Sequence, residues 1–150
     1  MRLAEDNGFR FVDIRMTLDR LWSLDQQIDN DTGGPGIIRS HRPGDILRLK
    51  AIAAASHHDS RFYYDPEFPR AKCDALYETW IEKSCNGYAN IVFVADVGGR
   101  ADGYISCHLL TDGEGQIGLV GIASESQGRG LGGRLVKKAL GWFAEKGASH

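Results

Sequence analysis

The sequence predicts an α/β (α+β) domain in which a mostly antiparallel sheet is flanked by helices. Three apolar runs between residues 90 and 123 are separated by turn clusters of four residues, which are too short for crossover helices. Helical patterns precede these runs, and a strongly amphipathic helical pattern follows them. The 150 residues, of which 42% are hydrophobic, are enough to build the core of one globular domain.

The N-terminal part of the chain differs from the rest. Residues 12–19 alternate strictly between apolar and polar side chains, which is the pattern of a half-buried strand. Residues 23–36 are rich in acidic, amide and glycine residues, as is typical of a linker. Because one strand cannot bury its apolar face alone, this strand either docks on the main sheet or belongs to something larger, and we expect residues 1–22 to be the remnant of an N-terminal domain. Residues 37–150 are expected to form the main domain.

The main domain is expected to begin with a short strand at residues 36–40 and a helix at residues 42–57. A second helix is expected at about residues 70–84, where an Asn-Gly pair ends the pattern. The expected buried face of this second helix consists of Cys73, Leu76, Trp80 and Ser84.

The sheet is expected to continue with strands at residues 90–96, 101–110 and 115–123, joined as an antiparallel meander. A third helix is expected at residues 129–144, with an apolar stripe that packs against the sheet. That stripe consists of Leu131, Leu135, Ala139 and Trp142.

A glycine-rich stretch separates the last strand from the third helix. The sequence "SESQGRGLGGRLV" places four glycines within the six positions 128–133. Glycine permits left-handed backbone angles and lets a ligand approach the main chain closely. The unpaired N–H groups and the dipole at a helix N-terminus attract anions. The stretch therefore predicts a phosphate-binding loop.

Two other kinds of phosphate-binding loop, and a turn that binds no ligand, have to be compared with this pattern. Gly128, Gly130 and Gly133 have the spacing of a dinucleotide-binding fingerprint, but five residues separate the preceding strand from the first glycine. A nucleoside-triphosphate P-loop is excluded because no Gly-Lys-Ser/Thr follows. A simple turn before a closely packed helix remains an alternative.

The segment from Ile122 to Val136 resembles the acetyl-CoA motif of the GNAT family of N-acetyltransferases, Gln/Arg-x-x-Gly-x-Gly/Ala between a strand and a helix. Gln127, Gly130 and Gly132 match its fixed positions, although the family often has proline and an aromatic residue where Ser124 and Ser126 stand here. The resemblance implies acetyl-CoA as co-substrate. The cofactor-binding residues that it implies are Leu119, Val120, Gly121, Ile122, Gln127, Gly128, Arg129, Gly130, Leu131, Gly132, Gly133 and Arg134.

The acceptor is indicated by the aromatic segment "SRFYYDPEFP" at residues 60–69. It is either a hydrophobic connection in the core or an acceptor site, since aromatic faces and an arginine suit a base, a sugar and a diphosphate. Together with "NGFRFVDIRMTLD" and "GYISCHLL" it resembles the dTDP-fucosamine acetyltransferases, which implies a nucleotide-linked amino sugar as substrate. Another small amine, or a non-catalytic CoA-binding or structural role, are the alternatives. The expected substrate residues are Arg61, Phe62, Tyr63, Tyr64 and His108.

The resemblance also implies that the family's C-terminal strands are missing from this chain, together with the tyrosine that protonates the leaving thiolate. The general acid and base are therefore left open, with Tyr104 and His108 as candidates. The uncovered edge of the strand at residues 116–122 would allow a homodimer.

Other functions are disfavoured by composition. The net charge is −2 and the basic residues are dispersed, so nucleic acid is not an expected partner. No apolar run approaches the ~20 residues of a membrane span, and three well-separated cysteines fit the cytoplasm. His57, His58 and Asp59 are neighbours whose side chains diverge, so no metal site is expected there.

Overall fold

The computed structural model describes residues 3, 6–9, 17–18, 33–111 and 113–148. The predicted strand at residues 12–19, except for residues 17 and 18, lies outside the described residues, as does most of the predicted linker at residues 23–36. The predicted division into an N-terminal remnant, a linker and a main domain therefore stays a prediction.

Within the described residues, four strands form one antiparallel sheet in the order β1-β2-β3-β4. The strands are β1 (Ile37–Ser40), β2 (Ile91–Val97), β3 (Arg100–Leu109) and β4 (Gly115–Ile122). The last three are joined by tight turns, so the predicted antiparallel meander is confirmed.

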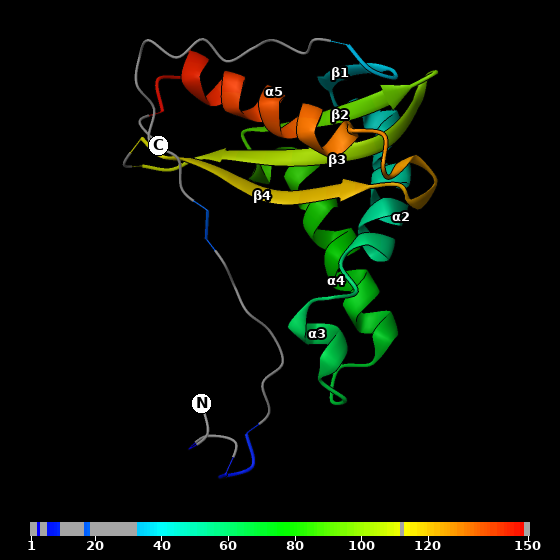
Figure 1. Cartoon of the computed structure of the whole chain (residues 1–150), viewed down its shortest axis with the longest axis vertical. Helices are drawn as coiled ribbons and strands as arrows, with labels where there is room; N and C mark the ends of the chain where they lie inside the picture. Colours follow the sequence, from blue (N-terminus) through cyan, green and yellow to red (C-terminus); the bar gives the residue numbers. More distant parts are fainter. Residues whose placement is uncertain (1–2, 4–5, 10–16, 19–32, 112, 149–150) are drawn as a thin grey trace.

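Helix α5 (Leu131–Glu145) covers one face of the sheet (Figure 1). Its predicted apolar stripe is confirmed, because all four residues are buried against β2 and β3. The helix begins two residues later than predicted. Gly130 has a left-handed φ of +78°, and the backbone N–H of Arg134 bonds the Gly130 carbonyl oxygen at 3.2 Å to close the first turn.

The opposite face is covered by α2 (Ile46–Ser56) and α4 (Arg70–Lys83), with the short helix α3 (Arg61–Tyr64) between them (Figure 1). A 3-10 turn at Pro43–Asp45 precedes α2, and a π-helical turn at Ser84–Tyr88 extends α4. This second core layer contains Leu49, Ile52, Ala53, Tyr77, Ile81 and Tyr104.

The predicted buried face of α4 is partly wrong. Cys73 and Ser84 are buried as predicted, but Tyr77 and Ile81 are buried as well. Of the other two predicted residues, Leu76 is only half-buried and Trp80 is 39% exposed. The Tyr77 ring stacks on His57 at the end of α2 with 4.4 Å between ring centroids. This aromatic contact between the helices turns Trp80 toward solvent.

Candidate functional site

The glycine loop connects the 3-10 turn Ser124–Ser126 to α5. Gly128 and Gly130 have φ of +73° and +78°, values that L side chains rarely adopt. A Cβ added at either glycine would have no heavy atom within 4 Å, so the outer side of the loop is open. At the start of α5 the N–H groups of the first turn precede the first intrahelical bond. The loop thus has the geometry of an anion site.

Three polar side chains of the predicted cofactor set lie in different surroundings. The Gln127 amide nitrogen donates to the Ile122 carbonyl oxygen at 3.3 Å and so ties the start of the loop to β4. Arg129 is exposed. The Arg134 guanidinium donates to the carbonyl oxygens of Pro35 and Gly36 at 2.7 and 3.1 Å, so it holds the chain ahead of β1.

Strand β4 carries the remaining predicted cofactor residues. Leu119 packs toward the α2 and α4 layer, whereas Val120 and Ile122 pack against the α5 layer. Gly121 lies against the ring of Tyr104, where an added Cβ would be 2.6 Å from a ring carbon. Glycine is therefore required at this point of β4.

A β-bulge interrupts the pairing of β3 with β4. Ile105 pairs with Val120, but Cys107 pairs with Ile117, so two β4 residues lie opposite the single residue Ser106. The buried Ser106 hydroxyl accepts the backbone N–H of Leu119 at 2.8 Å. A bulge bends a strand and increases its twist, and bulges are common beside active sites. Ser106 is not among the predicted site residues, although a serine within an apolar strand is a signal for such a role.

A cavity of about 620 Å³ lies beside this bulge and is lined by His108 from β3, Gly118 and Leu119 from β4, and Tyr88 and Trp80 from the α4 end, among others. Gly118 leaves space there, since an added Cβ would lie 2.7 Å from His108 Nε2. Burial lowers the pKa of His108, while a backbone hydrogen bond with Tyr88 acts in the opposite direction. The imidazole is thus mainly neutral at pH 7 and can accept a proton.

The aromatic segment divides between the two interpretations given above. Phe62 and Tyr63 pack against the core, and the Tyr63 hydroxyl donates to Asp74 Oδ1 at 2.7 Å. Tyr64 and Phe68 are 63% and 48% exposed and line a separate cavity of about 330 Å³ together with Tyr63. His108 does not line this second cavity, so the structure does not bring it together with the exposed aromatic residues.

Tyr104 is fully buried between the sheet and α2. Its hydroxyl lies 3.2 Å from His57 Nε2. Burial raises the pKa of Tyr104 and lowers that of His57, so both groups are neutral at pH 7. The Tyr104 ring and hydroxyl lie against Gly121, on the face of the sheet that α2 and α4 cover.

Metal ligation finds no support in the part of the chain that the structure describes, where no three His, Cys, Asp or Glu side chains cluster. His57 bonds Tyr104, whereas His58 Nε2 lies 2.9 Å from the Ala54 carbonyl oxygen. None of the described helices has the length and apolar character needed to cross a membrane.

Known proteins resemble this chain in both sequence and structure. It is 30% identical over 108 residues to the dTDP-fucosamine acetyltransferase of Escherichia coli O6:H1, an alignment that covers 69% of this chain and 44% of that protein. It is 27% identical over 98 residues to the spore coat polysaccharide biosynthesis protein SpsD of Bacillus subtilis, covering 65% of this chain and 34% of that protein. The chain thus spans less than half the length of these two curated relatives.

Among solved structures, a GNAT family acetyltransferase from Brucella melitensis in complex with acetyl-CoA has a TM-score of 0.52 and 25% identity, covering 75% of this chain and 70% of the other. The predicted GNAT fold is confirmed by this likeness. The sequence model of the acetyltransferase (GNAT) family matches residues 53–150, which is more than half of the chain. The chain therefore belongs to the GNAT acetyltransferase family.

Proposed function

We propose that this chain is part of an N-acetyltransferase that transfers the acetyl group of acetyl-CoA to the amine of a nucleotide-linked amino sugar, of the dTDP-4-amino-4,6-dideoxyhexose type. Membership of the GNAT family supports acetyl transfer, and the complex of the Brucella relative supports acetyl-CoA as donor. The name of the Escherichia coli relative, dTDP-fucosamine acetyltransferase, supports a nucleotide-linked amino sugar as acceptor, and the name of the Bacillus relative supports a role in polysaccharide biosynthesis.

The observation that carries the donor assignment is the open glycine loop at the start of α5. Two left-handed glycines leave the backbone unobstructed, and the N–H groups of Leu131, Gly132 and Gly133 lie at the positive end of the α5 dipole, ahead of the first intrahelical bond. The diphosphate of acetyl-CoA fits this site in charge. The exposed residue Arg129 would add a charge-assisted contact to the diphosphate.

The thioester would then lie along β4, near the bulge opposite Ser106. The amine attacks the thioester carbonyl carbon, the C–N bond forms, and the C–S bond breaks to release CoA thiolate. We propose that His108 Nε2 accepts the proton that the attacking amine loses, because this largely neutral imidazole lines the cavity beside the bulge. Passing that proton on to the thiolate would balance the reaction without a covalent enzyme intermediate.

The acceptor's nucleotide is proposed to bind at the aromatic segment. The exposed ring of Tyr64 offers a stacking surface for a base. Arg61 lines a cavity together with Tyr64, and its guanidinium lies over the Phe62 ring, 5.0 Å from the ring centre, where its positive charge suits a diphosphate. Phe62 and Tyr63, which pack in the core, would support this surface from below.

The experiment is a thiol-release assay with acetyl-CoA and a panel of amines. The panel contains dTDP-4-amino-4,6-dideoxygalactose, the same amino sugar without its nucleotide, and an unrelated primary amine. The proposal predicts CoA release that depends on the nucleotide sugar and drops sharply with the free sugar. Equal rates with all three amines would contradict the acceptor class, and release with none of them would contradict the transferase.

A further inference from the structure

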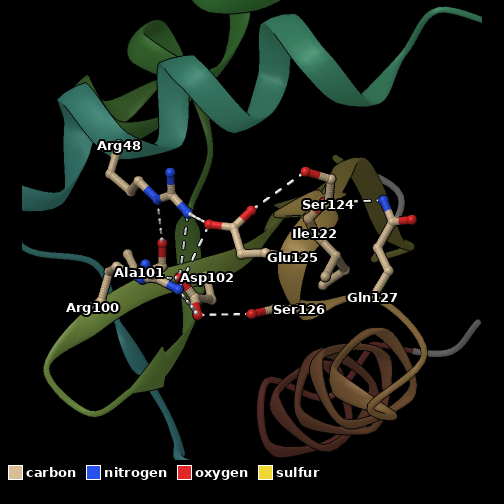
Figure 2. Close-up of polar contacts among 9 residues, drawn as sticks. All are labelled: Arg48, Arg100, Ala101, Asp102, Ile122, Ser124, Glu125, Ser126 and Gln127. Carbon is tan, nitrogen blue, oxygen red and sulfur yellow. Dashed lines mark hydrogen bonds and ion pairs between the residues drawn. The ribbon is translucent and has the colours of Figure 1, made fainter.

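A polar cluster around the turn that precedes the glycine loop joins three distant parts of the chain (Figure 2). Asp102 and Arg100 come from the start of β3, Arg48 comes from α2, and Glu125 and Ser126 come from the 3-10 turn before the loop. We call these five residues the Asp102 cluster. None of them belongs to the predicted cofactor set.

Asp102 is the centre of the cluster and is fully buried. Its carboxylate accepts Arg100 Nε and Nη2 at 2.6 and 3.0 Å, and Arg48 Nη2 lies 3.5 Å away. The Ser126 hydroxyl, on a residue that is 1% exposed, donates to Asp102 Oδ2 at 2.8 Å. Burial alone would raise the pKa of Asp102, but the bonds from Arg100 and Ser126 outweigh it and lower the pKa.

Glu125, the residue before Ser126 in the turn, is the more exposed carboxylate of the Asp102 cluster. The Glu125 carboxylate accepts a hydrogen bond from Arg48 and lies 3.6 Å from Arg100 Nη2. Two guanidinium groups thus balance two carboxylates. This balance matters beside the loop because an uncompensated carboxylate would repel a diphosphate.

The main chain is fixed at the same place. The Ala123 N–H donates to the Asp102 carbonyl oxygen at 2.8 Å, so the end of β4 and the turn are tied to one residue of β3. Gln127, the first residue after the turn, begins the glycine loop. Glycine-rich segments have many accessible backbone conformations, and only some of them direct their N–H groups at one anion.

We propose that Asp102 and Ser126 are positioning residues for the glycine loop, holding it in the conformation that receives the diphosphate of acetyl-CoA. This inference rests on the proposed function, because it assumes that the loop binds that diphosphate. If the anchor is released, the binding-competent fraction of the loop falls, and the apparent Kd rises in the same proportion.

The test compares Ser126→Ala with Ser124→Ala in the full chain. Ser124 is a matched control because it lies in the same turn but is exposed, with its hydroxyl bonded only weakly to Glu125 at 3.4 Å. Loss of one hydrogen bond to a charged group predicts a Kd for acetyl-CoA about tenfold weaker in Ser126→Ala. Ser124→Ala is expected to bind like the wild type.

A second readout separates positioning from general stability. Acetyl-pantetheine carries the thioester but no diphosphate, so its kcat/KM should be the same in Ser126→Ala and in the wild type. Arg100→Gln serves as a second variant because the Arg100 side chain is 56% exposed. Arg100→Gln leaves one guanidinium beside two carboxylates, so the net negative charge should repel the diphosphate and weaken acetyl-CoA binding. Because salt screens this repulsion, the loss of affinity should become smaller as the salt concentration is raised.

The outcomes distinguish the two proposals. A wild-type chain that fails to bind acetyl-CoA overturns the proposed function and this inference with it. A wild type that binds, with an unchanged Kd in Ser126→Ala, overturns the inference alone. Equal losses for acetyl-CoA and acetyl-pantetheine would also overturn it, because they would show that the serine supports the fold rather than the loop.

Discussion

Replacing Gly130 by leucine should weaken the binding of CoA about a hundredfold while leaving the fold in place. The φ of +78° at Gly130 imposes a backbone strain of about 1–2 kcal/mol on any L side chain. For a chain of this size the strain lowers the unfolding midpoint by about 2–8 °C. The leucine side chain would occupy the open space before α5, and losing two charge-assisted hydrogen bonds would weaken CoA binding about a hundredfold.

Gly147 provides the matched control at the other end of α5. Its φ is +74°, and an added Cβ there also meets nothing within 4 Å, so Gly147→Leu carries the same strain far from the loop. The assay is calorimetric titration with CoA, alongside thermal unfolding of both variants. Equal CoA affinity in the two variants would refute the assignment of the loop as the diphosphate site.

Three further predictions concern other groups of the site. Because the pKa of Asp102 is lowered in the folded state, its ionised carboxylate stabilises the fold at a pH above the unfolded pKa of about 3.9, and this stabilisation is lost as the pH falls through the folded pKa. The free energy of unfolding of Asp102→Asn should therefore depend less on pH in denaturant titrations from pH 6 to about 2. His108→Gln should lower kcat about a hundredfold or more and remove the fall of kcat at acid pH, which in the wild type has a pKa below about 6.5 because protonation of His108 inactivates the base. An unchanged dependence of kcat on pH would exclude His108 as the base. Tyr64→Ala should raise the acceptor KM and spare acetyl-CoA affinity, and equal losses for both ligands would instead mean that the ring supports the fold.

Much of the fold is predictable because its elements have strong local signals. The three strands of the meander are separated by glycine turns, and the stripe from Leu131 to Trp142 has a clear helical period. The glycine loop was also predictable, since four glycines in six positions exceed what one turn requires.

The rest depends on contacts between distant residues. The face of α4 was misassigned because Trp80 and Tyr77 fit an apolar stripe equally well, and the stacking of Tyr77 on His57 decides between them. The bulge opposite Ser106 arises from the way β4 pairs with β3, and the pattern of neither strand alone specifies where an extra residue is inserted. Asp102 lies in a strand that carries no sign of its partner Ser126, 24 residues later.

The central claim is that the glycine loop holds the diphosphate of acetyl-CoA, and a titration followed by the backbone amide resonances of the ¹⁵N-labelled chain tests it most directly. If the loop holds the diphosphate, CoA should cause saturable shifts of the amides from Gly128 to Gly133, and pantetheine, which lacks the diphosphate, should cause none. Shifts confined to other segments, or equal shifts of these amides with pantetheine, would contradict it.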